Sequence, residues 1–389
     1  MDSNFKILII NYEFPPLGGG GGVATYDLAL EWAKKAQVDV LTSSWKNLKK
    51  LEKINGINVY RVKVLFRKSR DAASFLSMLT YLVTGFWKGF FLIKKNRYQI
   101  INTHFALPSG PLGFIFNKIF KIPNVLSLHG GDIYDPSKKL SPHRNLFFKS
   151  VVKFILNKAT KIIAQSSNTR DNAFKYYNPK QEIGIIPLAF HPPKEQGVNL
   201  TPSKKIDSTK DDFKLITIGR LVKRKSIDTI IKALAKIDNK KIKLEIMGDG
   251  PEKSSLLDLV NKLQLQKKVS FLGFVSEEKK YQYLSQADLF VLTSLHEGFG
   301  IVYMEAMFFG LPIVCSNYGG QVDFLKNEEN ALLIDVEDVI GCQKAIERFY
   351  NDKNLYQKCM KQNIKKIKDF YAKTVAEKYL DLFVSLPLK

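Results

Sequence analysis

The feature that most constrains the fold is an alternation of apolar runs of strand length with amphipathic stretches of helix length, from residue 6 to residue 383. The strands expected in the first half are KILII (6–10), VDVL (38–41), INVYRVKV (57–64), QIINTH (99–104), NVLSLH (124–129), KIIAQS (161–166) and EIGIIP (182–187). Those expected in the second half are FKLITIG (213–219), KLEIMG (243–248), VSFLG (269–273), DLFVLT (288–293), PIVCS (312–316) and ALLID (331–335). Continuous apolar strands separated by helices are typical of a parallel sheet that is buried on both faces. The sequence therefore predicts an α/β fold with doubly wound, Rossmann-like sheets.

A break in this alternation divides the chain into two expected domains. The 389 residues can form two cores, because a single core stops growing at roughly 250–300 residues. Residues 191–212 are rich in Pro, Lys, Ser and Asp and show no periodicity, so we expect a linker at 196–212. The predicted domains are 1–195, joined by a C-terminal helix at 371–389, and 213–370.

Two features favour a reducing, cytoplasmic location. The three cysteines, Cys315, Cys342 and Cys359, have neither the spacing of a metal site nor that of a disulfide framework. The chain reaches an apolar strand within its first residues, without the long hydrophobic core and cleavage site of a signal peptide. We therefore expect a protein that is not exported.

The net charge of +23 is concentrated in the first half, where residues 1–195 hold 29 Lys and Arg against 12 Asp and Glu. Such a basic surface can attract nucleic acid, an anionic membrane or an acidic substrate. The sequence has no basic recognition helix, no aromatic RNA-binding motif and no zinc spacing, so we expect no nucleic-acid partner.

An apolar segment at 72–93 makes an anionic membrane surface the favoured partner. Basic residues flank the segment on both sides, at Arg67, Lys68, Arg70, Lys94, Lys95 and Arg97. Gly85, Lys88 and Gly89 interrupt it, so its uninterrupted apolar length is below the roughly 20 residues that a spanning helix needs. A helix lying in the membrane interface is the favoured interpretation. A buried helix and a spanning helix are the alternatives.

A run of five glycines, Gly18–Gly22, follows the first expected strand and precedes a helix that we expect to begin near Val23. Glycines let a ligand approach the backbone, and the start of a helix offers free amides to an anion, so a phosphate or pyrophosphate is a suitable ligand. The run is not the dinucleotide fingerprint, because Thr42 and Ser43 stand where an acidic residue would follow the second strand. A flexible surface loop is the alternative.

A cluster of cations, Arg220, Lys223, Arg224 and Lys225, follows the first expected strand of the second domain. Open α/β sheets bind ligands beyond the carboxyl ends of their strands, so these cations would face a bound anion. Fixed arginine and lysine groups can stabilise a departing diphosphate. A solvated basic loop is the alternative interpretation.

The most specific motif is HEGFGIVYMEAMFFGLP at 296–312, after the strand DLFVLT. Gly298 and Gly300 free the backbone at the start of an expected helix. Glu297 would lie just before this helix and Glu305 about two turns inside it, roughly 80° apart around the axis. Ionised carboxylates accept hydrogen bonds from vicinal hydroxyls, which suits a sugar or a ribose. A helix cap and a surface ion pair are the alternatives.

Taken together, these motifs resemble those of the retaining glycosyltransferases of family 4. The resemblance extends over nearly the whole chain, and the motifs occur in the family's order. They are the glycines at 18–22, His129-Gly130-Gly131-Asp132, Gly219-Arg220 with Lys225, the pair Glu297 and Glu305, and Asn317-Tyr318-Gly319-Gly320 with Asp323. The resemblance implies the GT-B fold, in which two Rossmann-like domains face each other across a cleft.

The resemblance also implies a role for each matched residue. Arg220 and Lys225 would bind the diphosphate of a UDP- or GDP-sugar, Glu297 would bind the hydroxyl groups of the sugar, and Glu305 would bind the ribose. His129 would lie against the donor sugar near the reacting carbon. The other implied donor contacts are Gly19, Gly20, Gly248, Asp249, Val275, Gly298, Phe299, Gly300 and Ile301.

Such enzymes need no metal and no cofactor beyond the nucleotide-sugar co-substrate. Two positions depart from the family's pattern: Asp323 stands where Glu is usual, and Ser226 stands where Gly commonly follows the lysine. A lone histidine at a strand end is more often structural. We therefore assign a role in the site to His129 alone and interpret the others, His104, His143, His191 and His296, as structural.

Retention of the anomeric configuration by double displacement needs a second carboxylate close to the first. Asp132 is the only carboxylate near a motif of the first domain, so we expect attack by the acceptor hydroxyl on the same face of the sugar that the diphosphate leaves. The expected acceptor is a lipid-linked sugar or an oligosaccharide of a cell-surface glycan, at the inner face of the cytoplasmic membrane. A catalytically silent scaffold, a nucleotide-sugar epimerase and a nicotinamide oxidoreductase are the alternatives.

Overall fold

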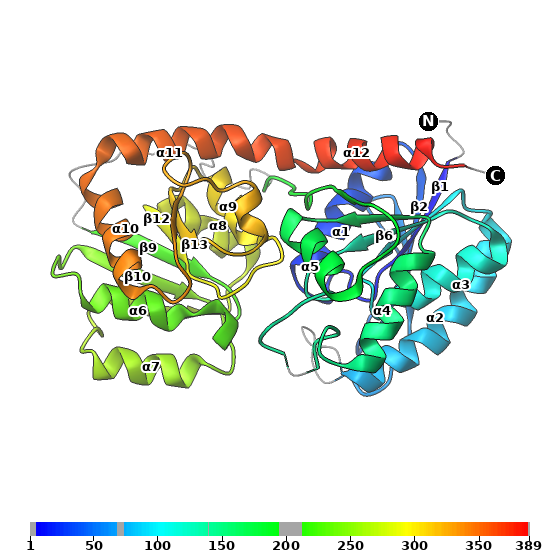
Figure 1. Ribbon diagram of the computed structural model, residues 1–389, viewed down its shortest axis with the longest axis horizontal. Helices are drawn as coiled ribbons and strands as arrows, with labels where there is room; N and C mark the ends of the chain where they lie inside the picture. The colour runs from blue at the N-terminus through cyan, green and yellow to red at the C-terminus, as the bar shows by residue number, and fades with distance from the viewer. Residues whose placement is uncertain (1–4, 68–73, 139, 194–211, 388–389) are drawn as a thin grey trace. The chain divides into compact units, whose positions relative to one another are not determined.

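The computed structural model describes residues 5–67, 74–138, 140–193 and 212–387. The chain divides into unit 1, Met1–His191 with Phe370–Lys389, and unit 2, Pro192–Asp369. The C-terminal segment thus groups with the N-terminal unit (Figure 1). Residues 196–211 of the expected linker lie outside the described residues. Lys68, Arg70 and the first two residues of the apolar segment also lie outside them.

Unit 1 contains an eight-stranded sheet in the order β3-β4-β2-β1-β5-β6-β7-β8. Its strands are β1 (Lys6–Ile10), β2 (Gln37–Ser43), β3 (Leu51–Ile54), β4 (Ile57–Val62), β5 (Ile100–His104), β6 (Asn124–Leu128), β7 (Lys161–Ala164) and β8 (Ile183–Ile185). All neighbours are parallel except β3 and β4. The expectation of a purely parallel sheet was wrong at this edge. Asn55 and Gly56, both with positive φ, form the two-residue hairpin turn that joins β3 to β4.

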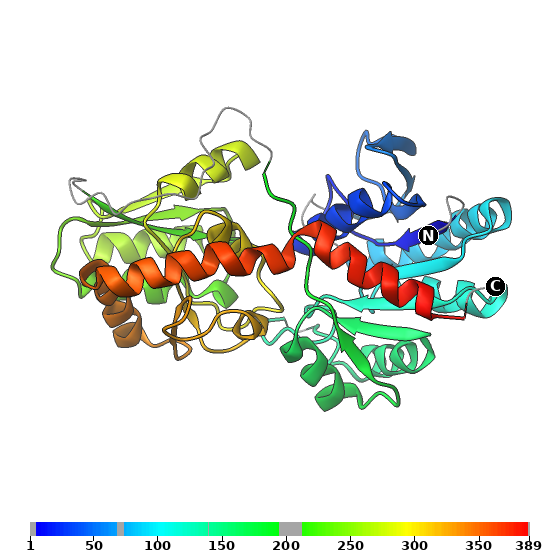
Figure 2. The same cartoon turned by 90° about the horizontal axis from the view of Figure 1, so that it is seen from above.

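Helices cover both faces of this sheet. They are α1 (Gly20–Trp32), α2 (Phe75–Asn96), α3 (Gly110–Phe120), α4 (Leu146–Lys158), α5 (Ser167–Tyr177) and α12 (Ala372–Ser385). Helices α1 and α12 share one hydrophobic core on one face, and α2 to α5 pack through two other cores. The indole of Trp32 contacts the rings of Tyr379 and Phe383, and its Nε1 donates to the carbonyl of Ala376. Figure 2 shows α12, in red, lying across the sheet of unit 1.

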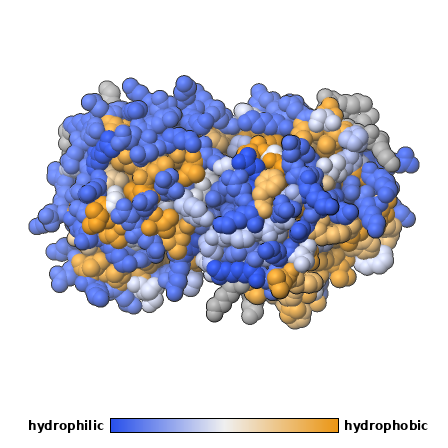
Figure 3. Space-filling model, viewed as in Figure 1, coloured by the Kyte–Doolittle hydropathy of each residue, from blue (hydrophilic) through white to orange (hydrophobic). Residues whose placement is uncertain are grey.

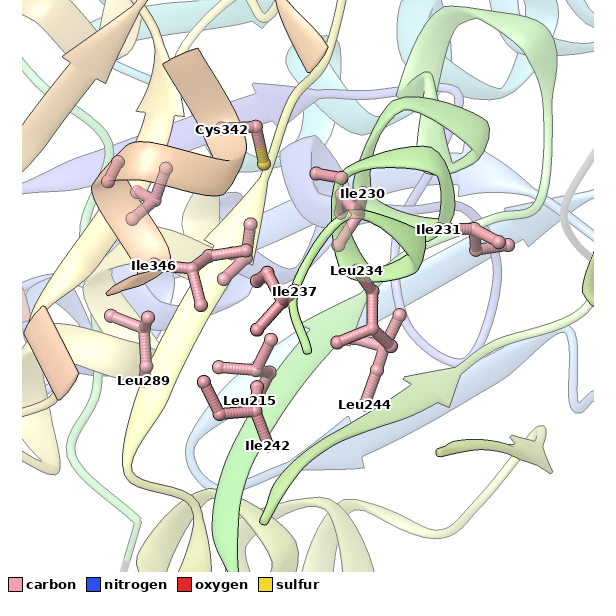
Figure 4. Packing of buried hydrophobic residues seen from close by; sticks show 14 of the residues in the cluster. Leu215, Ile230, Ile231, Leu234, Ile237, Ile242, Leu244, Leu289, Cys342 and Ile346 are labelled. Atoms are coloured by element: carbon pink, nitrogen blue, oxygen red, sulfur yellow. The ribbon is translucent and has the colours of Figure 1, made fainter. Parts of the chain in front are cut away.

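Unit 2 contains a parallel six-stranded sheet in the order β11-β10-β9-β12-β13-β14. Its strands are β9 (Phe213–Ile218), β10 (Ile242–Met247), β11 (Val269–Gly273), β12 (Leu289–Leu292), β13 (Ile313–Ser316) and β14 (Leu332–Ile334). Its helices are η1 (Lys223–Lys225), α6 (Ile227–Ala235), α7 (Lys253–Lys262), α8 (Glu277–Gln286), α9 (Ile301–Phe308), η2 (Gly320–Asp323), α10 (Val339–Asn351), α11 (Lys353–Lys366) and η3 (Ile367–Phe370). Figure 4 shows Leu215 of β9, Leu234 of α6 and Ile346 of α10 in its core.

In each sheet the strand order reverses at one point, between β1 and β5 in unit 1 and between β9 and β12 in unit 2. Ligands of open α/β sheets bind outside the carboxyl ends of the strands at this point of reversal. The glycine run follows β1, and His104 is the last residue of β5. Arg220 and Glu297 follow β9 and β12. The topology therefore places most of the sequence motifs where such folds bind ligands.

Candidate functional site

In unit 2 the centre of the site is a buried carboxylate held by two cations. Oε1 of Glu297 lies 2.7 Å from Nζ of Lys225 and 3.3 Å from Nη1 of Arg224. Burial by itself would raise the pKa of Glu297, but the charges of the two cations outweigh it and lower the pKa to about 2. The guanidinium of Arg224 also donates to the carbonyl of His296, so it fixes the loop that carries the glutamate. The sequence placed Arg224 in the cation cluster but indicated no individual role for it.

A short 3₁₀ turn, η1, presents these cations. It ends at Ser226, whose φ of 47° lies in the left-handed region. This conformation explains why glycine commonly occupies this position in the family that the sequence resembles. Here the Ser226 carbonyl accepts a hydrogen bond from Thr293, and its hydroxyl lies 2.9 Å from the Thr229 hydroxyl. Serine at this position therefore leaves the turn intact.

Arg220 differs from Lys225 in its surroundings. Its side chain is exposed, and within the described ranges no side chain is hydrogen bonded or ion paired with its guanidinium. Lys225 is buried and bound to Glu297. The structure therefore brings Lys225 and Glu297 into direct contact and leaves Arg220 available to a soluble anion.

The loop before α9 explains the glycines of the HEGFG motif. Gly300 has a φ of 94°, and a Cβ there would lie 2.5 Å from the ring of Tyr303. The side chain of Phe299 is buried against Phe324, and Gly298 and Ile301 are half-buried. Apart from the Glu297 side chain, this loop therefore offers mainly its backbone to a ligand, which is the kind of contact that the resemblance implies for Gly298 to Ile301.

Glu305 is the fifth residue of α9, so it lies about one turn inside the helix. The prediction of two turns was wrong, because the helix begins only at Ile301. Oε1 of Glu305 accepts from Nζ of Lys280 at 2.6 Å, and Oε2 is buried without a hydrogen-bond partner. Burial raises the pKa of Glu305 even though the Lys280 charge opposes it.

Lys280, on α8, is a contact that the sequence did not indicate. Its ammonium also pairs with Glu277 at 2.7 Å, and its pKa is raised because the two carboxylates outweigh its burial. Lys280 lies 25 residues from Glu305 in a helix with no recognisable motif. Only the packing of α8 beside α9 could reveal this contact.

The loops after β10 and β11 hold the remaining predicted donor contacts of unit 2. Gly248 has a φ of 136°, and a Cβ there would lie 1.9 Å from the carbonyl oxygen of Gly219. Asp249 is exposed and pairs with Lys253 at 3.3 Å. Val275 is half-buried, next to Phe274, whose side chain is 83% exposed. Gly248 is therefore needed for the close approach of two loops, whatever ligand they bind.

In unit 1 the glycine run is partly helical. Helix α1 begins at Gly20, not near Val23, because Gly20, Gly21 and Gly22 form its first turn after the N-cap Gly19. No side chain caps this end, and Gly19 and Gly20 are exposed. The first amides of the helix are thus available to an anion.

His129 lies in a cluster of aromatic and polar side chains at the ends of β5 and β6. Its ring stacks on Phe105 with centroids 4.3 Å apart, and its Nε2 lies 2.9 Å from Nδ1 of His104. Burial lowers the pKa of His129 to about 3. Burial, with the nearby His129, lowers the pKa of His104 well below its ordinary value. Both rings are therefore neutral at physiological pH.

Asp132 holds the His-Gly-Gly-Asp loop in place. Its carboxylate accepts from the backbone amides of Ala106 at 2.6 Å and of His129 at 2.9 Å. Burial raises its pKa to about 6, although these hydrogen bonds oppose the shift. Both oxygens are engaged with the backbone, which favours a structural role over a nucleophilic one.

The other histidines are accounted for by packing and hydrogen bonds. His143 contacts the rings of Tyr134 and Tyr176, His296 is buried near Tyr318, and the backbone amide of His191 donates to Asp27. Across the described part of the chain, His, Cys, Asp and Glu side chains form no group of three that could hold a metal ion.

Two family models and several curated proteins are similar to this chain. The model of a family described as Glycosyltransferase Family 4 matches residues 18–192, and that of Glycosyl transferases group 1 matches residues 201–366. The uncharacterized glycosyltransferase MJ1607 of Methanocaldococcus jannaschii is 28% identical over 93% of this chain and 96% of that protein. The lipopolysaccharide core biosynthesis glycosyltransferase LpsD of Rhizobium meliloti is 33% identical over 44% of this chain and 50% of that protein.

The fold is also shared with solved structures of other proteins. The structure of Anabaena HepE in complex with UDP has a TM-score of 0.79 and 21% identity to this chain, covering 98% of this chain and all of that one. The two family models match consecutive parts of the chain and together cover most of it. The chain therefore belongs to the GT-B glycosyltransferases of the family 4 type.

Proposed function

We propose that this glycosyltransferase transfers a hexosyl unit from a UDP- or GDP-sugar to a lipid-linked sugar or oligosaccharide in the synthesis of a cell-surface glycan, with retention of configuration. The observation that carries the proposal is the buried Glu297 between Lys225 and Arg224, at the point of strand reversal in unit 2. A fixed carboxylate next to fixed cations suits a ligand with hydroxyl groups on one side and phosphates on the other.

The proposal that the donor contains a nucleoside is supported by the surroundings of Glu305. Its Oε2 has no partner in the protein and is buried, which is costly unless a ligand donates a hydrogen bond to it. A ribose hydroxyl is a donor of the right kind. The complex of HepE with UDP is consistent with this class of ligand in the same fold.

The transfer step relies on positively charged side chains that are fixed near the expected position of the diphosphate. As the glycosidic bond breaks, negative charge develops on the diphosphate, and Arg220 and Lys225 would stabilise it without a metal. The acceptor hydroxyl attacks on the same face, giving its proton to the departing phosphate. The engagement of both Asp132 oxygens with backbone amides favours this route over a covalent intermediate on that residue.

We further propose that unit 1 binds an anionic membrane through α2. One side of α2 packs into unit 1, where Tyr81 donates to the carbonyl of Leu41 and Gly89 lies against Phe116. The opposite side exposes a stripe of large apolar side chains at helical spacing, made of Phe75, Leu76, Leu79, Val83, Trp87 and Phe91. In Figure 3 this region is the orange surface at the lower right.

Neighbouring residues extend this stripe. The ring of Phe75 contacts Phe148 of α4, and Leu146 and Phe147 beside it are exposed. Lys94 and Lys95 lie in the last turn of α2. By length and composition α2 is also able to cross a membrane, with 33% of its apolar window buried. Its packing against the core of unit 1 favours a helix lying in the interface.

The donor is tested with a panel of UDP- and GDP-sugars by thermal shift, followed by product analysis with EDTA present. A donor at 100 times its Kd should add about 2.7 kcal/mol of stability. Glu297→Gln, which keeps the shape of the side chain, should reduce the shift, because an amide accepts weaker hydrogen bonds from sugar hydroxyls than a carboxylate does. Turnover without metal and an unchanged anomeric configuration are expected. No stabilisation by any nucleotide sugar would contradict the proposal, and an isomerised donor without acceptor would indicate an epimerase.

Membrane binding is tested by co-sedimentation with vesicles of phosphatidylglycerol and of phosphatidylcholine. Replacing Trp87 and Phe91 by serine should lower binding to the anionic vesicles at least about tenfold, because burial of one large apolar side chain is worth about 1.5–3 kcal/mol. Leu257→Ser, at an exposed leucine of α7 in unit 2, is the matched control and should bind normally. Equal binding of all three proteins would contradict the proposal.

A further inference from the structure

The imidazole of His129 presents one ring nitrogen without a partner. Its Nδ1 is buried and has no hydrogen-bond partner in the protein. This atom lies next to the glycine run, since a Cβ on Gly21 would be 3.1 Å from it. An unpartnered polar atom in such a place indicates that a ligand completes its hydrogen bonding. Whether Nδ1 donates or accepts depends on the tautomer of the ring.

The tautomer is set by a chain of hydrogen bonds that begins at Asn102. Its Nδ2 donates to the carbonyl of Val125 at 3.0 Å and to the hydroxyl of Ser127 at 3.1 Å. A carbonyl only accepts, so this contact fixes the orientation of the amide. The atom facing His104 is therefore Oδ1, which lies 2.7 Å from Nε2 of His104. An amide oxygen also only accepts, so Nε2 of His104 must carry a hydrogen.

The direction of the hydrogen bond between His104 and His129 follows from the neutral charge of the two rings. His104 is neutral, so with a hydrogen on Nε2 its Nδ1 has a lone pair. That nitrogen lies 2.9 Å from Nε2 of His129, and two unprotonated nitrogens would repel each other at this distance. Nε2 of His129 must therefore donate. Thr25, 3.1 Å from the same Nδ1, has its own acceptor in the carbonyl of Gly21 at 2.7 Å.

We propose that Asn102 and His104 are positioning residues that hold His129 in the Nε2–H form, so that its Nδ1 accepts a hydrogen bond from a hydroxyl group of the bound sugar. The inference rests on the proposed sugar-transfer function of the chain. In the Nε2–H form, Nδ1 of His129 can only accept a hydrogen bond. The site should therefore select a sugar with a hydroxyl group at the contacted carbon over a sugar that is deoxygenated or carries a carboxylate there.

Two replacements of one residue separate this role from packing. Asparagine and leucine have the same branched skeleton, but only the asparagine oxygen can accept from Nε2 of His129. His104→Asn should keep the tautomer and most of the turnover. His104→Leu should lower turnover by up to about tenfold, the value of one hydrogen bond. It should also reduce discrimination between the accepted donor and its singly deoxygenated analogues.

The tautomer is read directly by long-range ¹H–¹⁵N NMR of the full chain labelled at its five histidines. In the unaltered protein Nδ1 of His129 should give the signal of an unprotonated nitrogen and Nε2 that of a protonated one. His104→Asn should preserve this pattern, and His104→Leu should give a mixture. Signals are assigned by their loss in His129→Gln and His104→Asn.

The outcomes are distinct. A protonated Nδ1 in the unaltered protein, or the same tautomer and turnover in the asparagine and leucine variants, would overturn the inference. If the leucine variant does not fold, as judged by circular dichroism and Tm, the NMR pattern of the unaltered protein and of Asn102→Asp decides. A carboxylate at position 102 should favour the charged form of His104, in which both ring nitrogens carry a hydrogen. Nδ1 of His104 would then donate to Nε2 of His129, and the hydrogen of the His129 ring would move to Nδ1. Failure of the proposed function would appear separately, as no binding of any nucleotide sugar.

Discussion

Nζ of Lys225 lies 2.7 Å from Oε1 of Glu297, and their side chains are only 11% and 8% exposed. The resemblance assigns these residues to different parts of the donor, the diphosphate and the sugar. In the structure each is the other's partner, with Arg224 as a second cation. The pair therefore holds a carboxylate next to an ammonium group in a buried place, where burying either group alone would cost free energy.

Breaking this pair should destabilise unit 2. Lys225→Met leaves Glu297 with Arg224 alone and should lower the free energy of unfolding by about 3 kcal/mol, as for other broken buried pairs. The double variant Lys225→Met/Glu297→Leu should lose less than the single one, because no unpaired carboxylate remains. Urea unfolding measures both. Purely additive effects of the two changes would mean that the contact is not coupled.

Arg220 should matter for turnover and not for stability. Its exposed side chain has no partner among the residues that the structure describes, so Arg220→Ala should leave Tm unchanged. It should lower kcat by at least about 10²-fold if the guanidinium supplies a few kcal/mol to the departing diphosphate. Lys262→Ala, at an exposed lysine in the last turn of α7, is the matched control with normal turnover. Equal rates for both variants would contradict the role of Arg220.

Glu305→Gln should weaken binding of the nucleoside diphosphate by about tenfold, since a neutral amide accepts a weaker hydrogen bond than a carboxylate. The loss should be much smaller for the 2′- and 3′-deoxyribose analogues of the same nucleotide. Isothermal titration calorimetry measures these affinities. A loss that is the same for ribose and deoxyribose would place Glu305 away from the sugar of the nucleotide.

Asp132→Asn should destabilise unit 1 in a pH-dependent way. The amide can accept from only one of the two backbone amides, at a cost of about 1–3 kcal/mol. The pKa of Asp132 is raised from 3.8 to about 6, so its contribution to stability is full below pH 3.8 and is lost as pH rises through 6. The difference in unfolding free energy between the two proteins should therefore shrink by up to about 3 kcal/mol from pH 4 to pH 8. A difference independent of pH would contradict the shift.

The sequence predicted most strands and both sheets, because continuous apolar runs have few other stable arrangements. It missed the β3–β4 hairpin, whose first strand LEKI is partly exposed and charged at the sheet edge, although Asn55-Gly56 is a hairpin signal. It also placed the start of α1 three residues late, since glycines have low helix propensity in isolation. Tertiary packing overrode that local preference.

The sequence by itself determined the family and the order of its motifs, since these depend on residue types at short spacing. The contacts of Lys280 with Glu305 and of His104 with His129 were decided only by tertiary structure. These partners are 25 residues apart in each case and belong to different helices or strands. The two histidines meet because β5 and β6 are parallel neighbours whose carboxyl ends lie at one edge of the sheet. Lys280 meets Glu305 because α8 packs beside α9. That packing, not the local sequence, sets which nitrogen of His129 and which oxygen of Glu305 has no hydrogen-bond partner among the described residues.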